Sequence, residues 1–507
     1  MIILTCEIIC FSIAIFGLIY IWFYYKFTYW LRKGVDGPKP MFPCGNLQKV
    51  LRSKEQFFQP YCDNYFKYKN LPYVGMYSFQ RPVLLINDLD IAKLILIKDF
   101  EYFQSRGTFA GGPSDPLSEN LFNIHGTPWK NLRLKMTPSF SSAKVKSMYS
   151  IVNDISTQAV KYAESFYAKQ EAVNFTELYS KYAMEIIANV GFGVECNGFT
   201  NPRSEFYTKG TEYFDNPSLY WRLIRSLSFF APDLFGKLKI KRITQELEDF
   251  FFNLVKNTVE YRKKHSYKRN DFLQSLIELK DGYSDETLKL SSFTMMDIAA
   301  NAMLYMIAGY ETSATTGQFA AYLLAANPQI QKKAREEIFR VLARHDGEFS
   351  FEAQNEMIYM NMVIDESMRM YPSMRAIFRR CNKEYQLPTG LVIEKGTMVF
   401  IPANAIHMDP DLYPDPEKFE PERFSSENKT KMHPCQWIPF GEGPKKCLGI
   451  RQGYIQTKMA LVKILLKYEL LLDERMTVPI KIKASSLVCA AEGGIWLKLR
   501  TLDALNQ

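Results

Sequence analysis

The sequence lacks the features of a disulfide-stapled, zinc-binding or disordered protein. Its nine cysteines are scattered, no two of them have CxxC spacing, and they do not cluster with the five histidines. Neither a disulfide framework nor a zinc site is therefore expected. There is no low-complexity tract or fixed repeat, and 47% of the residues are hydrophobic against 23% charged, which argues against extensive disorder. The thiols point to a reducing compartment, where a single thiolate can be a ligand or nucleophile.

Charge is nearly absent from the amino terminus. Residues 2–25 carry one charged side chain, Glu7, and no basic residue precedes them. The run is long enough to cross a bilayer. An aromatic belt and the basic residues Lys26, Arg32 and Lys33 accompany its end, which by the positive-inside rule places the body of the protein in the cytosol. A cleaved signal peptide is the alternative, but the segment has no basic n-region and no small-residue cleavage site.

Three parts are expected along the chain. Residues 1–26 form an uncleaved transmembrane anchor. The prolines and glycines between residues 34 and 46 cannot continue a helix, so residues 27–46 are expected to be a stiff, basic linker. Residues 47–507 then form a single domain.

The body of the chain alternates between strand-like and helical patterns. The runs at 73–79 and 81–88 predict strands of a small sheet, and short strands return after Pro372. Eight prolines between Pro402 and Pro444 mark a long irregular segment, and loops of this length are usually functional. Helical periodicity predicts helices at 127–137, 142–168, 174–191, 243–265, 292–326, 328–344 and 354–370, with a last one opened by Cys447. The predicted fold class is mainly α with small β-sheets (α+β).

Cys447 lies in the stretch "PFGEGPKKCLGIRQG", between a glycine-rich, basic loop and the last predicted helix. A helix start favours a thiolate. Gly441, Gly443 and Gly449 would let the backbone pass close to a flat ligand and direct N–H groups at the sulfur. For an isolated cysteine, an inert buried thiol would be the simpler interpretation.

Five motifs in order decide between these interpretations. Residues 440–449 (Phe-Gly-x-Gly-x-x-x-Cys-x-Gly) resemble the haem-binding loop of cytochromes P-450. Residues 366–369 are similar to the family's ExxR, 421–424 to its PERF segment, 308–312 to its oxygen-activating helix motif, and 129–133 to its WxxxR. The chain is identified as a member of the cytochrome P-450 superfamily over essentially its whole length, anchor included. The resemblance implies the cytochrome P-450 fold with an N-terminal transmembrane helix.

The resemblance implies that haem b is the cofactor, with the Cys447 thiolate as its iron ligand. Lys445 stands where the family usually has an arginine, so a bidentate propionate contact would become a single charged one. Gln452 and Gly453 replace the usual Phe-Ala, which puts packing or redox potential there in doubt. The implied cofactor-binding residues are Cys447, Trp129, Arg133, Arg379, Lys445, Phe440, Gly441 and Gly449, with the neighbouring Arg380 as the alternative to Arg379.

Glu366 and Arg369 are three residues apart on one helical face and can pair. In the family, the arginine of PERF, here Arg423, joins them in a buried network behind the haem. A surface ion pair, worth little, is the alternative, but apolar neighbours such as Val363 and Met368 favour burial. The expected role of this network is fold specificity rather than chemistry.

The middle of the long helix at 292–326 is unusual. Gly309 weakens the hydrogen-bond ladder and Thr312 can divert a hydrogen bond, so a local opening could hold dioxygen and water. Glu311 and Thr312 are the implied catalytic pair for proton delivery. Helix packing through small residues is the alternative.

Alignment to the family's substrate-contact segments implies a largely aromatic and aliphatic pocket, suited to a greasy substrate. Arg375 either biases it toward an acidic group or faces out of it. Residues 213–242 are aromatic and basic, which predicts either a second membrane contact or a helix pair over the pocket. The implied pocket residues are Phe103, Phe109, Phe122, Asn301, Tyr305, Met374, Ile377 and Ala490.

The implied activity is a monooxygenase that inserts one oxygen atom from O2 into small lipophilic molecules. No G-x-G-x-x-G fingerprint lies in a βαβ context, so electrons from NADPH must come through an external flavoprotein. An NADPH–cytochrome reductase is the expected partner, with cytochrome b5 as a candidate second donor, together with membrane lipid and no nucleic acid. The net charge of +9 and a basic face on the cysteine side suit an acidic flavoprotein, although such a surface could equally favour anionic lipid. The expected members of this face are Lys130, Arg133, Lys135, Lys445, Lys446, Arg451 and Lys458.

Several segments, among them "FQSRGTF", resemble the insect microsomal branch associated with plant toxins and insecticides. The expected location is the endoplasmic reticulum membrane, with the catalytic domain on the cytoplasmic side. Two alternatives stay open. One is a reductase-independent enzyme of the same fold that rearranges peroxides, which the Glu311–Thr312 pair disfavours. The other is a non-catalytic haem or ligand-binding protein.

Overall fold

The computed structural model describes residues 2–201, 203–215, 218, 220–221, 224, 228–229, 232–281 and 293–502. Several positions of the aromatic and basic segment 213–242, including Arg222 and Arg225, therefore lie outside the described residues, as does residue 292 at the expected start of the long helix.

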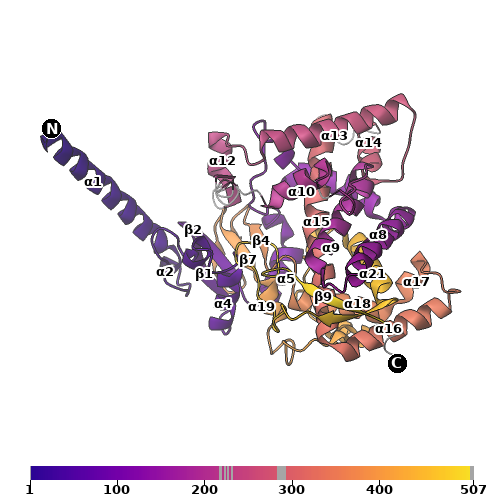
Figure 1. The fold of residues 1–507 in the computed structure, drawn as a ribbon. Helices are drawn as coiled ribbons and strands as arrows, with labels where there is room; N and C mark the ends of the chain where they lie inside the picture. Colours follow the sequence, from indigo (N-terminus) through magenta and orange to yellow (C-terminus); the bar gives the residue numbers. More distant parts are fainter. Residues whose placement is uncertain are drawn as a thin grey trace.

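Helices form most of the body (Figure 1). The longest, α15, begins at a capping box in which Thr294 and Asp297 bond each other's backbone N–H groups, the arrangement that satisfies the first free donors of a helix. The predicted helical body is confirmed. The main helices are α6 (Gly126–Met136), α8 (Tyr149–Tyr167), α9 (Phe175–Ile186), α13 (Gln245–Lys264), α15 (Met295–Ala326), α16 (Pro328–Ala343), α18 (Ile358–Met370) and α21 (Ile450–Leu465).

Three predicted helices are interrupted. The segment 142–168 divides at Met148 into α7 (Ser142–Ser147) and α8, and α9 continues as a π-helical turn, η5 (Ile187–Phe192). The segment 354–370 divides into α17 (Phe351–Glu356) and α18. The carboxylate of Glu337 on α16 accepts the backbone N–H groups of Tyr359 and Met360 at 2.7 and 2.9 Å. This tertiary cap starts α18 where the sequence pattern alone shows no boundary.

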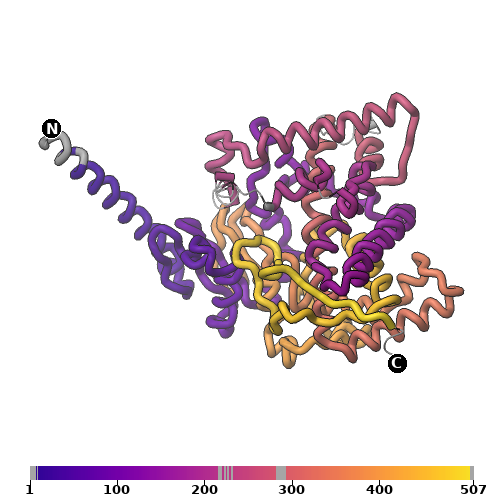
Figure 2. The backbone as a smooth tube through the Cα atoms, viewed as in Figure 1, coloured from indigo at the N-terminus to yellow at the C-terminus, as the bar shows by residue number. Residues whose placement is uncertain are grey.

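Small sheets flank the helices, as predicted. The largest has the order β1-β2-β7-β4, with β1 (Tyr73–Ser78) antiparallel to β2 (Arg81–Ile86) and β7 (Met398–Ile401) parallel to β2. β4 (Ile377–Arg380) pairs antiparallel with β7. A second sheet contains β3 (Val173–Asn174), β9 (Trp496–Thr501) and β8 (Tyr468–Leu472), and β5 (Tyr385–Gln386) pairs with β6 (Val392–Ile393). The C-terminal segment passes across the front of the molecule in Figure 2.

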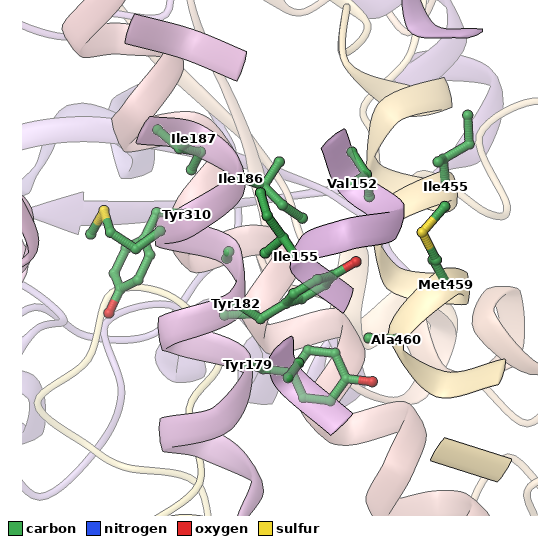
Figure 3. Close-up of a cluster of buried hydrophobic side chains, with 14 of the residues drawn as sticks. Val152, Ile155, Tyr179, Tyr182, Ile186, Ile187, Tyr310, Ile455, Met459 and Ala460 are labelled. Atoms are coloured by element: carbon green, nitrogen blue, oxygen red, sulfur yellow. The ribbon is translucent and has the colours of Figure 1, made fainter. Parts of the chain in front are cut away.

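The main core lies where α8, α9, α15 and α21 meet. Val152 and Ile155 of α8 face Tyr182 of α9 and Met459 of α21 (Figure 3), and all four side chains are buried. A Cβ on Gly317 of α15 would lie 2.1 Å from the Tyr179 ring, so α9 and α15 approach too closely for a larger residue there. This packing holds α15 across the body.

The N-terminal helix α1 (Ile2–Phe27) projects away from the body (Figures 1 and 2). Among the described residues it is the one helix long and apolar enough to cross a membrane, over Ile9–Phe27. After the short α2 (Tyr29–Arg32), the chain packs onto the sheet. The buried Trp30 donates its indole N–H to the carbonyl of Met76 on β1 at 2.9 Å.

Candidate active site

The Cys447 loop folds back on itself through backbone hydrogen bonds. The N–H of Cys447 donates to the carbonyl of Phe440 at 3.0 Å, and the N–H of Gly441 donates to Ile438 at 3.0 Å. Gly441 and Gly443 have φ of +70° and +75°, a region that favours glycine. A Cβ on Gly443 would lie 1.8 Å from the carbonyl oxygen of Leu96, so only glycine fits there.

Helix α21 begins at Ile450, three residues after Cys447, so the expectation that the cysteine opens the helix is wrong by almost one turn. The Gly449 N–H, at the N-cap, reaches the sulfur. Burial raises the pKa of the Cys447 thiol, while Gly449, Arg133 and Arg106 oppose the rise. The side chain is nevertheless open to solvent. The sulfur is therefore accessible although protein groups surround it closely.

Four cationic side chains lie around this sulfur. Lys445 and Arg379 are each 3% exposed, and Arg106 and Arg133 are half-buried. Arg106 donates to the carbonyls of Phe122 at 2.9 Å and of Lys445 at 3.2 Å. Within the described part of the chain, none of the four pairs with a carboxylate, and Arg379 Nε has no hydrogen-bond partner.

The electrostatic consequence is large. Burial, followed by Arg106, Arg379 and Arg133, lowers the pKa of Lys445 to about 5. Burial also lowers the pKa of Arg379 to about 10. Buried charges are costly unless they are paired, so an anion bound among these side chains would stabilise their charged forms.

The residues fit haem. A flat cofactor with two carboxylates would neutralise the cationic cluster while its iron reaches the thiol of Cys447. The structure brings the predicted Arg133, Arg379 and Lys445 together with Cys447, and the Lys445 ammonium lies 4.7 Å from the centre of the Trp129 ring. Among the remaining predicted contacts, the Phe440 ring packs near Tyr454, at 5.7 Å between centroids, and a Cβ on Gly449 would meet only ordinary contact with Phe140.

Arg106 is the member of the cluster that sequence reasoning missed. It lies between two predicted pocket residues, Phe103 and Phe109, and 339 residues before Lys445. A lone arginine in an aromatic segment was the available signal.

Thr312 lies midway along α15, and its hydroxyl donates to the carbonyl of Ala308 at 2.6 Å. The predicted diversion of a hydrogen bond is therefore present, but α15 is helical throughout 295–326, so the expected local opening is not. Ala308 is exposed, whereas the other residues of α15 are buried or half-buried, Glu311 among the latter. The exposure of Ala308 marks the part of α15 that borders open space.

Ser373 is a further residue that the sequence did not indicate. Its hydroxyl donates to the carbonyl of Thr312 at 3.0 Å, and its own carbonyl accepts the N–H of Cys489 at 3.0 Å. Thr315 of α15 donates to the Cys489 carbonyl at 3.2 Å. These bonds tie the predicted pocket segments around Met374 and Ala490 to α15.

Glu366 and Arg369 form a fully buried pair, each with 0% exposure. Arg369 donates to the two carboxylate oxygens of Glu366 at 2.7 and 2.9 Å, and to the carbonyls of His407 and Pro416 at 2.8 and 2.7 Å. Arg423 Nε lies 3.5 Å from the same carboxylate, an ion-pair contact without hydrogen-bond geometry. The alternative of a surface pair is wrong.

The predicted pocket residues divide into two groups. Ile377 and Met374 are half-buried, and the Ile377 side chain reaches within 4.0 Å of a Cβ built on Gly441. Ala490 is half-buried and Phe122 is exposed, with the Arg106 guanidinium 4.2 Å from the Phe122 ring centre. These four border the Cys447 loop, α15 or the cationic cluster.

The other four are engaged with neighbouring protein. Tyr305 stacks on Phe272 at 4.5 Å, and the buried Phe103 and Phe109 pack on Tyr385 and on Phe235 of α12 (Pro232–Leu238). The Asn301 Oδ1 accepts the N–H of Leu121 at 3.1 Å. Their assignment to the pocket stays a prediction.

Arg375, for which two interpretations were open, is 9% exposed and donates to Asn404 at 2.6 Å. Two other charged side chains differ from expectation. Lys445 and Lys458 are each 3% exposed, so neither belongs to a basic surface on the cysteine side, whereas Lys130 and Arg451 are exposed. Whether each of these charged side chains reaches the surface depends on tertiary packing, which the pattern of charges in the sequence does not show.

Several known proteins are similar to this chain over almost its whole length. The family model described as cytochrome P450 matches residues 35–497. Probable cytochrome P450 6a14 of Drosophila melanogaster is 37% identical over 502 residues, 96% of this chain and 98% of the relative. Cytochrome P450 6a2 of the same organism is 36% identical, covering 97% and 98%. Cytochrome P450 6k1 of Blattella germanica is 35% identical, covering 94% and 93%.

Proposed function

Because the chain belongs to the cytochrome P450 family and is an insect protein of the same group as the cytochromes P450 6a, we propose that it is a membrane-anchored monooxygenase. Its substrates are small lipophilic compounds. It inserts one atom of O2 into substrates such as plant toxins, insecticides or endogenous lipids. The observation that carries the proposal is the unpaired cationic cluster around the accessible sulfur of Cys447, because this donor set suits haem with a cysteine ligand.

Bound haem with a thiolate ligand supplies the cleavage of the O–O bond. Arg106, Arg133, Arg379 and Lys445 hold and orient the carboxylates of the cofactor. The Thr312 hydroxyl donates a hydrogen bond to the Ala308 carbonyl. When this side chain rotates, the same O–H group can donate its proton into the space beside Ala308. Glu311, one residue earlier and half-buried, exchanges protons with solvent. The apolar side chains of Ile377, beside Gly441 of the cysteine loop, and of Met374, next to the Ser373 that bonds α15, would exclude water from the site.

Electrons come from NADPH through a cytochrome reductase, with cytochrome b5 as a second donor. The exposed Lys130 and Arg451 support docking of an acidic flavoprotein. We place the protein in the endoplasmic reticulum membrane, with residues 1–26 as anchor, 27–46 as linker and 47–507 as a single catalytic domain in the cytosol.

Reconstitution with NADPH–cytochrome reductase tests the function. With a panel of lipophilic hydrocarbons, NADPH oxidation should require reductase, and the alcohol formed by hydroxylation at carbon should carry one oxygen atom from labelled dioxygen. Product formed from a peroxide without reductase would support the rearranging enzyme instead. Substrate binding by haem-loaded protein without turnover would support a binding protein.

Thr312→Ala is the informative variant in this assay, and Thr316→Ala, one turn further on, is its control. Loss of the Thr312 hydroxyl should lower product per NADPH severalfold and raise hydrogen peroxide, because proton delivery to oxygen slows. The control should show a much smaller change. Equal coupling in Thr312→Ala and wild type would remove Thr312 from proton delivery.

Deleting residues 2–27 tests the anchor. Most of the truncated protein should leave the membrane fraction, because the apolar run over Ile9–Phe27 supplies the main attachment. Leu234 and Leu238 on α12 are 51% and 60% exposed, and α12 lies at the same end of the molecule as α1 (Figure 1). Residual binding should therefore fall when both leucines are replaced by glutamate. Unchanged sedimentation of the truncated protein would contradict the anchor.

A further inference from the structure

His407 is a buried residue with no role in the function described so far. It ends the short helix α19 (Ala403–His407) and is 0% exposed. Its Nε2 accepts the backbone N–H of Ile438 at 2.9 Å. Ile438 lies nine residues before Cys447, where the cysteine loop begins.

The same residue is bonded to the Glu366–Arg369 pair. Arg369 donates from its guanidinium to the backbone carbonyl of His407 at 2.8 Å. His407 thus lies between the buried ion pair on α18 and the start of the Cys447 loop. The backbone carbonyl of His407 accepts a hydrogen bond from Arg369 of that pair, and its imidazole accepts one from Ile438 of the loop.

The hydrogen bonds continue from Ile438 to the cysteine. The Ile438 carbonyl accepts the N–H of Gly441, and the Phe440 carbonyl accepts the N–H of Cys447, both at 3.0 Å. Gly443 fits against the Leu96 carbonyl only because it lacks a Cβ. Because these contacts restrain the loop, a displacement of Ile438 would also displace the Cys447 sulfur.

The state of the imidazole follows from its contacts. Since Nε2 accepts a hydrogen bond, the ring is neutral and its proton is on Nδ1. Nδ1 has no partner among the residues that the structure describes. Burial, then Arg369, lowers the pKa of His407 to about 3, which agrees with a neutral ring.

This arrangement has a cost that packing alone does not explain. A buried donor without a partner lowers the stability of the fold. A leucine would fill a similar volume without that cost. What a leucine cannot provide is the acceptor at the Nε2 position, so the acceptor is the feature that distinguishes histidine here.

We propose that His407 is a positioning residue, whose Nε2 anchors the Ile438 end of the cysteine loop to the Glu366–Arg369 pair and so holds Cys447 as the iron ligand. This inference rests on the proposed haem-thiolate function. His407 does not touch the reacting atoms.

The test compares His407→Gln with His407→Leu. In glutamine, Oε1 is as many bonds from Cβ as Nε2 is in histidine, so glutamine can restore the acceptor, whereas leucine cannot. His407→Asn is a third variant that keeps a polar amide but places its acceptor one bond short. It also serves as the acceptor-deficient variant if the leucine protein does not fold.

The readout is the carbon monoxide difference spectrum of the purified, dithionite-reduced holoprotein, followed over time. The red-shifted, thiolate-type band should decay in the leucine and asparagine variants about tenfold faster than in wild type, the scale of one lost hydrogen bond. The glutamine variant should stay within about twofold of wild type. The reduction potential should shift in the same two variants and not in the glutamine variant.

Two outcomes would overturn the proposal. One is a leucine variant whose band and potential match wild type, since the acceptor would then not matter. The other is a glutamine variant that decays as fast as leucine, which would assign His407 to packing. A wild-type protein without any thiolate-type band would instead contradict the proposed function. Failure of the His407 proposal and failure of the proposed function are therefore distinguishable.

Discussion

Replacing Cys447 with alanine should abolish the red-shifted carbon monoxide band of the reduced protein and all reductase-dependent product formation. The sulfur is the accessible atom at the centre of the cationic cluster, and alanine offers no ligand in its place. No smaller loss is expected, because a thiolate ligand is what directs the chemistry of the bound haem toward O–O cleavage. The variant should be examined as purified protein with its haem content determined.

Cys435→Ala is the matched control. Cys435 lies twelve residues earlier, before the same loop, and is 0% exposed. Burial, its largest influence, raises the pKa of the Cys435 thiol to about 12, so it supplies no thiolate near neutral pH. The control should keep the wild-type band. A normal band in Cys447→Ala, or its loss in Cys435→Ala, would refute the ligand assignment.

Replacing Arg369 with leucine should destabilise the fold by about 3–5 kcal/mol, the range for breaking a buried ion pair from one side. The substitution leaves the Glu366 carboxylate buried and unpaired, and removes donors from the carbonyls of His407 and Pro416. Urea unfolding and the yield of haem-loaded protein measure the effect. We expect a much lower urea midpoint and little holoprotein.

The double variant Glu366→Gln with Arg369→Leu is the control for charge. Removing both charges avoids the stranded carboxylate, so the double variant should be more stable than Arg369→Leu alone. A double variant less stable than either single variant would show that the hydrogen bonds to the carbonyls dominate. An Arg369→Leu protein with a wild-type urea midpoint would contradict the buried pair altogether.

Local pattern predicted most of the fold because apolar residues recur at helical spacing through the body. The long helix was expected from residue 292, and its start at Met295 is set by the capping box of Thr294 and Asp297. The break before α18 was missed because its cap comes from Glu337 on another helix. The π-helical turn at Ile187–Phe192 was missed as well. It packs where the Ile187 side chain reaches Gly309 of α15, a tertiary contact.

At the site, the motifs predicted the identity of several residues around Cys447. They did not predict the burial or the hydrogen-bond partners of those residues. Arg133, Arg379 and Lys445 were expected near Cys447 because short motifs carry them. Arg106 and Ser373 have no such motif, and their relevant partners are 339 and 61 positions away in sequence. The burial of Lys458, whose ammonium donates to the Gln354 carbonyl at 2.5 Å, likewise depends on how α17 and α21 pack.

The bond from Trp30 to β1 has a consequence for how substrate is supplied. It joins the sheet to the base of α1, so with α1 in a bilayer the body is held at the lipid surface rather than on a free tether. A lipophilic substrate of the proposed monooxygenase would then reach the protein from the lipid phase, where partitioning concentrates it. Apparent affinities measured in detergent and in vesicles would differ by the oil–water partition coefficient of each compound, and the rank order of substrates would change with the membrane content of the assay.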